Sequence, residues 1–477
     1  MAYENVLSDK KCDYRVYFLG AGGISMSALC LYLNKKGFFV GGYDKEKNDC
    51  VKKLENAGIK IDSGRLLTVS NGEIANESVP VGLKNCNAVV YTSALASDDP
   101  LLIYARRSGK AVISRAELLA EILKNYRFSI GVSGTHGKTT ATLMLCHIFK
   151  CANVDFEAHA GGCDNTFGNF VAGKGSNECF ISEICEYKRN ISLFSPSVAV
   201  VLNIDDDHLE SYGGFSDLAN EFIGFARRSG VCVYNDDDKV LQERLPSECA
   251  DKAISYSIKN ENCDYFARKI KVAGNKITFR AYYRKKDLGD FEINGVLKHN
   301  VLNALAAIAA ARVYGINVDD IRRGLKEYVG AYRREEKIGE FNGATVFADY
   351  CHHPRQIKET VRALEKSGAE RVTIVFQPHT FSRTKLLFKK FLSALKTQRA
   401  RLIITGVYAA REKYDYYGSG RRLAENISNA VFIEKPDSAV KTALAGACSG
   451  DVIAFLGAGD IYFAAKKYLD ENKKVGL

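Results

Sequence analysis

The sequence has no long uninterrupted hydrophobic run. None of its 477 residues lies in an apolar stretch of the roughly 20 residues that a membrane-spanning helix needs. Charged residues also interrupt residues 1–18, so no secretory signal peptide is expected there. Hydrophobic residues make up 46% and charged residues 26%, proportions typical of a globular chain that buries several cores. We therefore expect a cytoplasmic protein without a membrane span.

Closely spaced cysteine pairs are missing as well. The 14 cysteines are scattered, and no C-x-x-C pair occurs. Disulfide scaffolds are short and dense in cysteine, and zinc sites need regular ligand spacing, so the sequence predicts neither. Internal repeats and low-complexity segments are also absent. We expect reduced thiols distributed over several packed domains.

The positive charge is not gathered in one block. The net charge is +11, but the basic stretches YYRKK (282–286) and GRRL (420–423) are short and belong to no nucleic-acid module. A basic balance favours anionic partners in general, anionic small substrates among them. We expect no nucleic-acid partner, and a solvated cationic surface is the simplest explanation of the excess charge.

Strands that run into glycine turns and helices recur along residues 1–125. Residues 15–20, 38–44 and 87–94 have the pattern of apolar strands, and a helix-like stretch over 115–127 closes the series. Strands that alternate with helices predict a parallel sheet covered on both faces. Residues 1–125 are therefore predicted to form a Rossmann-like domain.

Residues 126–330 are predicted to form a central domain. Apolar strands are expected at 128–133, 179–183 and 198–203. Residues 255–294 instead alternate apolar and polar side chains between turns, which is typical of an antiparallel sheet. An alanine-rich helix follows and ends at Gly315, and a shorter helix completes the domain. The prediction is a parallel sheet with a small antiparallel sheet beside it.

Residues 331–477 return to the doubly wound α/β pattern. Helical stretches separate the strands expected at 344–350, 371–377, 401–408, 430–434 and 451–459. The whole chain is thus predicted to be an α/β protein of three domains, in which a second Rossmann-like domain follows the central P-loop domain.

A phosphate loop is predicted at GVSGTHGKTT (131–140). Glycines allow backbone N–H groups to point inward, and the N-terminus of the next helix favours anions. Lys138 suits the outer phosphates of a nucleotide, and the Thr139 hydroxyl suits Mg²⁺. Val132 replaces the first glycine of the usual G-x-x-x-x-G-K-[ST] pattern, but Gly134 lies two residues further on. We expect a nucleotide at this loop.

A second glycine loop lies at GAGGIS (20–25). It resembles a dinucleotide fingerprint, although Ser25 stands at the position of the third glycine. Asp44 closes the next strand at a distance suited to a ribose contact, and Thr92 and Ser93 follow a neighbouring strand. The loop predicts a diphosphate but not the nucleotide that carries it. A tight turn that binds nothing is the alternative.

Acidic residues follow two strands of the central domain. Glu183 ends one strand, and NIDDDHLESYG places Asp205, Asp206, Asp207 and His208 after the next. Because the carboxyl ends of parallel strands meet at one edge, these residues are expected beside the phosphate loop. Carboxylate and imidazole groups there can bind Mg²⁺. An exposed acidic turn is the alternative for at least two of the aspartates.

Taken together, these motifs resemble the Mur ligase family, and particularly its alanine-adding branch. The resemblance covers nearly the whole chain. It rests on motifs in this order: GAGGISMS, GTHGKTT, NIDDDHLESYG, HNVLNALAAIA, YRREEKIG, DYCHHPRQI, FQPHTFSRT, VYAARE and GAGDI.

The resemblance implies a function for each domain. The first domain binds a UDP-sugar rather than NAD, the central domain binds ATP, and the third closes over both. The implied reaction is an ADP-forming ligation of L-alanine to the lactyl carboxylate of UDP-N-acetylmuramate through an acyl phosphate, in peptidoglycan precursor synthesis. Mg²⁺, with two ions, is the implied cofactor. The chain is expected to be a monomer or a weak homodimer.

The resemblance also implies roles for individual residues. ATP contacts are carried over to Gly134, Thr135, His136, Gly137, Lys138, Thr139, Thr140, His299, Asn300 and Asn303. Metal ligands are carried over to Thr139, Glu183 and His208. UDP-sugar contacts are expected at Gly20, Gly22, Gly23, Ile24, Ser25, Asp44, Thr92 and Ser93. The catalytic set implied is Lys138, Glu183, His208, Arg334, His353 and Arg383, with Asp349 and His352 near the substrates.

Four departures separate this chain from the family pattern. Ser25 replaces a glycine, EICEYKRN stands where E-A-D-E-S is common, Thr380 stands where an arginine is common, and Cys351 replaces a small residue. They leave the ATP site intact and affect the substrate site.

Several alternatives remain open. Within the family, the chain could be a ligase that recycles murein peptides or one that adds another amino acid. Residues 209–225 contain no lysine, whereas other branches carry a carbamylated lysine there, which favours the alanine branch. Outside the family, an NAD-dependent oxidoreductase and an inactive nucleotide-binding protein are the alternatives.

Overall fold

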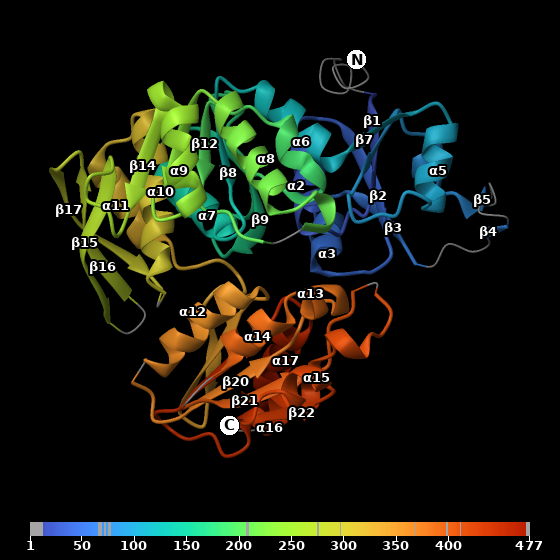
Figure 1. Ribbon diagram of the computed structural model, residues 1–477. Coiled ribbons are helices and arrows are strands. Elements are labelled where there is room, and N and C mark those ends of the chain that lie inside the picture. Colours follow the sequence, from blue (N-terminus) through green and yellow to red (C-terminus); the bar gives the residue numbers. More distant parts are fainter. Residues whose placement is uncertain are drawn as a thin grey trace. The chain divides into compact units, whose positions relative to one another are not determined.

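The computed structural model forms two compact units of mixed α/β structure (Figure 1). The first unit contains residues 1–271, 278–293 and 299–328, and the second contains 329–477 with the short segments 272–277 and 294–298. The structure describes residues 13–64, 69–70, 73–74, 78–206, 209–273, 276–295, 297–366, 368–396, 399–410 and 412–473. Three main sheets within these ranges confirm the predicted fold class.

The first sheet is parallel, as predicted, with the strand order β3-β2-β1-β6-β7. Its strands are β1 (Arg15–Leu19), β2 (Phe39–Asp44), β3 (Lys60–Ser63), β6 (Ala88–Tyr91) and β7 (Ala111–Ser114). The accompanying helices are α2 (Ile24–Lys35), α3 (Asp49–Asn56), α4 (Val81–Lys84), α5 (Pro100–Arg107) and α6 (Arg115–Lys124). Three of these helices, α3, α5 and α6, have N-cap side chains: Asn48, Asp99 and Ser114 accept hydrogen bonds from backbone N–H groups of the first turn. The short strands β4 (Val69–Ser70) and β5 (Glu73–Ile74) pair with each other.

The central sheet has the order β10-β9-β11-β8-β12-β13-β14-β15-β16-β17. Its strands are β8 (Phe128–Ser133), β9 (Phe156–Asp164), β10 (Gly168–Val171), β11 (Cys179–Glu183), β12 (Val198–Val201), β13 (Val231–Asn235), β14 (Ala253–Ser257), β15 (Tyr265–Ala273), β16 (Lys276–Tyr283) and β17 (Lys286–Asn294). Its α-helices are α7 (Lys138–Cys151), α8 (Phe215–Arg228), α9 (Lys239–Glu248), α10 (His299–Tyr314) and α11 (Val318–Glu327). The 3₁₀ segments are η2 (Tyr187–Leu193), η3 (Leu209–Ser211) and η4 (Ala250–Lys252).

The segment predicted as a small antiparallel sheet continues this central sheet. β14 pairs in parallel with β13, so it extends the parallel part. Rings of Phe266 and Tyr282 stack at 4.8 Å, and those of Tyr265 and Tyr283 lie 4.7 Å apart, so residue numbers run in opposite directions along β15 and β16. β15 and β16 are therefore antiparallel, as predicted, but they belong to the same continuous sheet as the strands of the phosphate-loop domain. At the other edge β10 pairs antiparallel with β9, which the sequence analysis did not predict.

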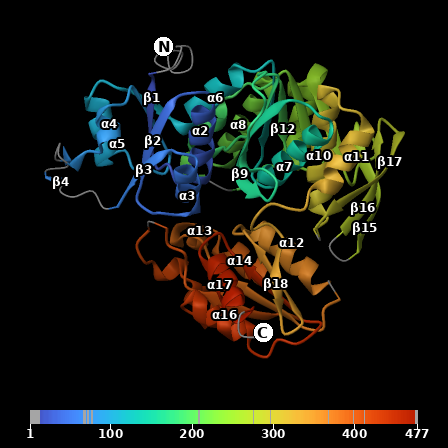
Figure 2. The ribbon, with the colours of Figure 1, turned by 180° about the vertical axis from the view of Figure 1, so that it is seen from behind.

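Helix α2 joins the first two sheets into one core. It packs against β9 and β10 (Figures 1 and 2), and the ring of Tyr32 meets Phe170 and Phe180 edge-on at 6.1 and 6.0 Å. One buried apolar cluster accordingly runs from Val16 in β1 to Cys249 after α9. The predicted boundary at residue 125 falls between α6 and β8, inside this shared core.

The second unit contains a sheet with the order β18-β19-β23-β20-β21-β22. Its strands are β18 (Glu336–Phe341), β19 (Ala344–Asp349), β20 (Val372–Phe376), β21 (Arg401–Thr405), β22 (Ala430–Ile433) and β23 (Val452–Leu456). Its helices are α12 (Pro354–Glu365), α13 (Phe381–Leu386), α14 (Phe388–Leu395), α15 (Gly420–Glu425), α16 (Pro436–Leu444) and α17 (Ile461–Lys473), with the 3₁₀ turn η5 (Tyr416–Gly418).

Alternate residues along the strands of this sheet belong to two separate hydrophobic cores. Ile374 and Phe376 of β20 pack with α12, α14 and α15, whereas Val375 between them packs with α16 and α17. This is the doubly wound arrangement predicted for residues 331–477. β18, which was not predicted, adds an antiparallel strand at the edge. Within the described residues, no helix is both long and apolar enough to cross a bilayer.

Close packing of α11 on α7 generates a stability prediction. A Cβ on Gly324 would lie 2.4 Å from the Cα of Ile148, and backbone cannot move aside cheaply. We expect Gly324→Ala to destabilise the protein by about 2 kcal/mol through overpacking. In Gly224→Ala, within α8, the nearest atom is Nη1 at the end of the long Arg228 side chain, which can shift more easily than backbone, so that variant should lose much less stability. Urea unfolding followed by circular dichroism compares them, and equal midpoints would contradict the prediction.

Candidate active site

The phosphate loop lies between β8 and α7, as predicted. Gly134 and Gly137 have φ values of 141° and 85°, a region that residues with a Cβ rarely adopt. Gly137 is the N-cap of α7 and has no side chain to accept the first-turn N–H groups. These groups therefore point from the helix start toward the position of an anion.

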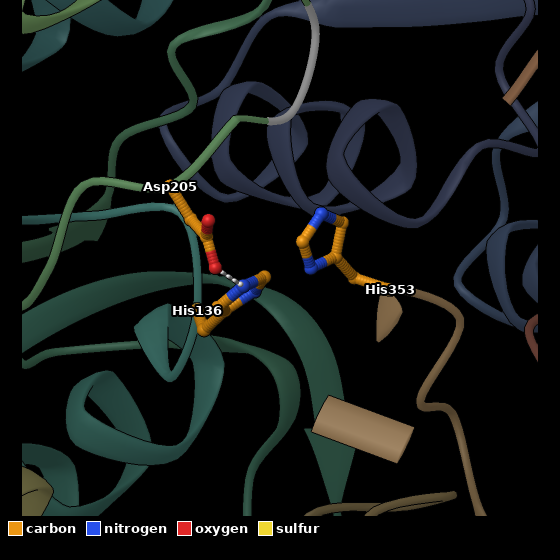
Figure 3. Close-up of side chains that lie close together, drawn as sticks. All are labelled: His136, Asp205 and His353. Atoms are coloured by element: carbon orange, nitrogen blue, oxygen red, sulfur yellow. Dashed lines mark hydrogen bonds and ion pairs between the residues drawn. The ribbon is translucent and has the colours of Figure 1, made fainter. Parts of the chain in front are cut away.

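Asn203, in the segment after β12, fixes the shape of the phosphate loop. The Asn203 side chain accepts from the His136 N–H at 2.8 Å and donates to the His136 carbonyl at 2.9 Å. The Thr135 hydroxyl accepts from the Asp205 N–H at 2.9 Å, and the His136 ring lies 3.3 Å from the Asp205 carboxylate (Figure 3). The residues that follow β12 therefore fix the conformation of the phosphate loop through side-chain and backbone hydrogen bonds.

Lys138 folds back over its own loop. Its ammonium donates to the carbonyls of Gly134 and Thr135 at 2.6 and 3.2 Å and forms an ion pair with Glu186 at 3.0 Å. The side chains of Lys138 and Glu186 are only 13% and 2% exposed, so both charges are largely desolvated. Burial is the largest single effect and lowers the pKa of Lys138, but the charges of Glu186 and Glu183 and the hydrogen bond to Glu186 together with the neighbouring Cys185 outweigh it, and the net direction is upward. Lys138 therefore stays cationic in the site.

Glu183 and Thr139 lie together beside the loop. The Thr139 hydroxyl donates to Glu183 Oε2 at 2.7 Å, and the Gly161 N–H donates to the same oxygen at 2.9 Å. A Cβ on Gly161 would lie 2.4 Å from Glu183 Oε1, and one on Gly162 would lie 2.8 Å from Thr139 Cγ2. The two glycines of β9 therefore make room for this pair. Carboxylate and hydroxyl oxygens are hard donors of the kind that Mg²⁺ prefers.

His208 and Asp207, which the sequence analysis placed at the metal site, lie outside the described residues. Asp205 and Asp206 are described, and both are half-buried. The prediction for His208 stays a prediction.

The start of α10 reaches the phosphate loop. Asn300 and Asn303 are 6% and 5% exposed, and Asn303 donates to the Asn300 side chain at 3.2 Å. A Cβ on Gly137 would lie 2.5 Å from Asn303 Oδ1, so this amide is in contact with the loop. His299 begins the helix and is half-buried. The structure thus brings two asparagines of the HNVLN motif to the predicted nucleotide site.

The first glycine loop is built by similar means at the start of α2. Gly20 has φ 82°, and the Tyr43 carbonyl accepts from the N–H groups of Gly20 and Ala21. The Asp44 carboxylate accepts from the Gly22 N–H at 2.8 Å, so this acid holds the loop itself. Gly23 is the N-cap of α2, and Ile24 is its first residue.

The turn after β6 lies against this loop. A Cβ on Gly20 would lie 2.5 Å from Thr92 Cγ2, and the carbonyl of the next residue, Ser93, accepts from Lys188 at 2.7 Å. Both predicted residues therefore lie beside the first glycine loop, and Lys188 adds a cation that the sequence analysis did not select.

Ser25 makes polar contacts with two other elements. Its hydroxyl lies 2.6 Å from Nε2 of His159 in β9 and accepts from Arg115 of α6 at 3.0 Å. Burial lowers the pKa of His159 to about 3, and the nearby charge of Arg115 adds to the shift. His159 is therefore a neutral imidazole.

In the second unit, polar side chains gather where the parallel strands end. Asp349 ends β19 and accepts from the Cys351 N–H at 2.8 Å. Arg383 of α13 donates to His379 at 3.1 Å, and the His379 ring stacks on Tyr408 at 5.5 Å.

Two consecutive arginines follow at the beginning of this unit. The Arg334 guanidinium lies 4.9 Å from the Tyr350 ring centre. Arg333 is held among the rings of Tyr350, Tyr462 and Phe463 and donates to the Gly459 carbonyl at 2.6 Å. The structure thus ties Arg333 to the GAGD loop, residues 457–460.

His353 is the N-cap residue of α12 and is buried. Thr380 is the N-cap residue of α13 and has φ 64°.

Sequence reasoning missed several residues that shape the site. Glu186 was read only as part of a departing motif, yet it is the buried partner of Lys138. Asn203 lies two residues before the predicted acidic residues Asp205–Asp207. Gly161, Gly162 and His159 lie in β9, a strand that was not predicted. The adjacent pair Gly161–Gly162 within FEAHAGGCD (156–164) was a usable signal, because strand glycines often mark close approach.

The loops and sheets together define an α/β protein with a phosphate-loop motif at the start of α7 and a second glycine loop at the start of α2. Comparisons with known proteins agree with this class. Family models match in three consecutive segments: the Mur ligase family catalytic domain at 15–127, the Mur ligase middle domain at 132–311 and the Mur ligase glutamate ligase domain at 333–459.

Relatives and solved structures extend over nearly the whole chain. The UDP-N-acetylmuramate–L-alanine ligase of Clostridium beijerinckii is 36% identical over 474 residues, covering 98% of this chain and 99% of that protein. The ligase of the same name from Acetivibrio thermocellus is 37% identical, with 97% of each chain covered. The structure of the UDP-N-acetylmuramate–alanine ligase from Thermotoga maritima aligns with a TM-score of 0.79 at 24% identity, covering 97% and 99% of the two chains. That of a murein peptide ligase from Psychrobacter arcticus gives 0.67 at 23% identity, covering 96% and 98%.

The chain belongs to the Mur ligase family. This confirms the family and the enzyme class, a ligase, that the motifs predicted. It also disfavours the alternative of an NAD-dependent oxidoreductase, because the first domain falls within a ligase model.

The crowding at Gly161 generates a prediction for metal dependence. In Gly161→Ala the new Cβ must displace the Glu183 carboxylate, since the two would lie 2.4 Å apart. We expect the Mg²⁺ concentration for half-maximal ligase activity to rise by about 10-fold or more. Gly41→Ala in β2, whose nearest contact is 3.5 Å, serves as the control and should keep the normal dependence. A normal Mg²⁺ titration for Gly161→Ala would remove Glu183 from the metal site.

Proposed function

We propose that this protein is an ADP-forming ligase that joins L-alanine to the lactyl carboxylate of UDP-N-acetylmuramate in cytoplasmic peptidoglycan precursor synthesis. The observation that carries this proposal is the near full-length similarity, at 36–37% identity, to ligases with that name. The geometry of the two glycine loops supports it, because each presents a helix start suited to phosphate.

ATP is the proposed co-substrate at the α7 loop. A carboxylate is a poor electrophile, so its oxygen first attacks the γ-phosphate to give an acyl phosphate, and the amine of L-alanine then displaces phosphate. Phosphoryl transfer depends mainly on positioning and charge neutralisation. The first-turn N–H groups of α7 and Lys138 supply this, with the outer phosphates replacing Glu186 as the partner of Lys138. Thr135, His136, Thr140, His299 and the two asparagines would line the nucleotide.

The oxygen pair of Glu183 and Thr139 fits Mg²⁺, and His208 is proposed to complete the set. When bound, Mg²⁺ neutralises charge on the phosphate oxygens. The chain's own contribution is to hold both oxygen donors beside the loop. Gly161 does this through its N–H bond to Glu183, and Gly162 through the space that it leaves for Thr139.

The UDP-sugar is proposed to bind at the α2 loop. Gly20, Gly22 and Gly23 leave the backbone accessible, and the N–H groups from Ile24 onward face the diphosphate. Thr92 and Ser93 lie beside this loop and are proposed to contact the rest of the ligand. Arg334, His353 and Arg383 are proposed as catalytic residues. We further propose three functional domains, over residues 1–125, 126–330 and 331–477.

An omission assay tests the function. Phosphate release should require ATP, Mg²⁺, UDP-N-acetylmuramate and L-alanine together, each being left out in turn. Replacing L-alanine by a murein tripeptide distinguishes the recycling ligase, which would prefer the peptide. Equal phosphate release without the UDP-sugar would refute the proposal.

Lys138→Ala tests the phosphate loop separately. Loss of a cation that neutralises the transferred phosphate should lower the rate by about 100-fold or more. UDP-sugar binding should stay normal, because the α2 loop lies on a different sheet. Lys150→Ala, at the exposed end of the same helix, is the matched control and should keep its activity. A rate for Lys138→Ala above about a tenth of normal would rule out the proposed role.

A further inference from the structure

The start of η2, directly after Glu186, contains two consecutive residues in the left-handed region of backbone conformation. Lys188 has φ 54° and ψ 34°, and Arg189 has φ 59° and ψ 19°. Residues with a Cβ rarely adopt this conformation, and such strain persists only where surrounding contacts impose it. Both residues belong to EICEYKRN, the segment in which this chain departs from a more acidic pattern. The strained backbone therefore coincides with sequence that is particular to this chain.

Contacts of Arg189 impose this conformation. Its guanidinium donates to the carboxylates of Asp217 and Glu221, both in α8, at 3.2 and 3.0 Å. It also lies 5.1 Å from the ring centre of Tyr212. The backbone N–H of Arg189 donates to the Glu186 carbonyl at 3.1 Å, so the turn is closed on the residue that pairs with Lys138. Arg189 is therefore held by the central domain on its side-chain and backbone atoms.

Lys188 contacts a different element, the turn that follows β6 in the first sheet. Its ammonium donates to the Ser93 carbonyl at 2.7 Å. The preceding residue, Thr92, lies against the first glycine loop, because a Cβ on Gly20 would approach Thr92 Cγ2 to 2.5 Å. Lys188 therefore brings a cation from the central domain to the turn beside the α2 loop.

The Lys188 ammonium has donors left for a ligand. An ammonium group has three N–H donors, and Ser93 is the only hydrogen-bond acceptor that the described residues provide for it. Within the same residues no carboxylate forms an ion pair with Lys188. The side chain is exposed, so it can move to a nearby anion without breaking a buried contact. Its charge is therefore available to a ligand at the α2 loop.

The other charges at the α2 loop call for a second cation. Asp44 contributes a negative charge, since its carboxylate accepts from the Gly22 N–H at 2.8 Å. Arg115 contributes a positive charge, since it donates to the Ser25 hydroxyl at 3.0 Å in the first turn of α2. These two charges offset each other, whereas the diphosphate of a UDP-sugar is dianionic. Lys188 adds positive charge on the side of the turn after β6.

We propose that Lys188 binds the diphosphate of the UDP-sugar, its ammonium moving from the Ser93 carbonyl to a phosphate oxygen at the start of α2. The inference rests on the proposed function, because it takes the α2 loop to be the UDP-sugar site. The central domain then contributes a direct contact to the ligand of the first glycine loop. Because Arg189 fixes the turn before the ligand arrives, less conformational freedom is lost on binding.

Calorimetry of the full-length protein with UDP-N-acetylmuramate tests this contact. Lys188→Met keeps the length of the side chain and removes its charge. We expect its Kd for the UDP-sugar to rise by about 10-fold or more, because a charge-assisted hydrogen bond is lost. The Kd for UDP should rise by a similar factor, since UDP also carries a diphosphate but has no lactyl carboxylate.

Two further substitutions separate the charge from the backbone strain. Lys188→Asn also removes the charge, but asparagine tolerates the left-handed region, so this variant should lose affinity as Lys188→Met does without added strain. Lys188→Arg keeps a cation and should bind the UDP-sugar within about 3-fold of the wild type. A purely structural role of Lys188 in the turn would instead be preserved by asparagine.

Lys252→Met is the matched control. Lys252 also belongs to the central domain, and its ammonium donates to the backbone carbonyls of Arg227 and Ser229, each at 2.7 Å. It precedes β14, at the amino end of a parallel strand, whereas both glycine loops follow the carboxyl ends of strands. Lys252→Met should keep the wild-type Kd for both ligands, whereas a general effect of losing one positive charge would weaken its binding too.

The outcomes separate the two proposals. If the wild type binds neither UDP-N-acetylmuramate nor UDP, the proposed function is wrong and the inference falls with it. If the wild type binds the UDP-sugar and Lys188→Met binds it as tightly, the inference alone is overturned. It is also overturned if Lys188→Met weakens binding of UDP-N-acetylmuramate but not of UDP, because the lysine then contacts another part of the ligand. Weaker binding of both ligands by Lys188→Met and Lys188→Asn, with retention in Lys188→Arg and Lys252→Met, supports it.

Discussion

The ion pair between Lys138 and Glu186 sets the conditions for the rest of the nucleotide site. Two opposite charges lie nearly out of water, and leaving either one alone there would be costly. The protein meets this demand with carbonyls from its own loop and with a second acid, Glu183, which also raises the pKa of Lys138. The carbonyls of Gly134 and Thr135 contact the Lys138 ammonium directly, Gly161 of β9 positions Glu183, and Asn203 fixes the loop backbone. Under the proposed function, the phosphate replaces the Glu186 carboxylate as the anionic partner of Lys138.

Much of the fold follows from local sequence patterns. The strands before both glycine loops, the alanine-rich α10 and the doubly wound second unit are short-range features, and all were predicted. Sheet order was not predictable in the same way. β14 pairs in parallel with β13, and β9 and β10 pair antiparallel at the opposite edge, but the apolar pattern of a strand does not specify its partner or its direction. Alternation of apolar residues along 255–294 indicated strands but not the sheet to which they belong.

The site was predictable where a motif carries its own geometry. Lys138, Thr139, Gly134 and Gly137 stand next to one another in sequence, and the turn between strand and helix brings them together. Glu186, Asn203 and His159 reach the site through tertiary packing, so no spacing rule selects them. Asp44 illustrates an intermediate case. Its position after β2 was identified, but its carboxylate holds the Gly22 N–H and thereby shapes the loop.

The contact between Asn303 and Gly137 has a consequence for how the chain folds. The phosphate loop is translated early, whereas the strand loop that carries Asn203 and the helix that carries Asn303 follow much later in the sequence. Such non-local contacts pay the entropy of closing long loops before they stabilise anything, and they slow folding. A ribosome-bound chain that ends before α10 thus carries the glycine loop without one of its walls. Under the proposed function, full nucleotide affinity therefore requires α10 as well as the central sheet, and bound nucleotide stabilises the complete central domain over partially folded forms.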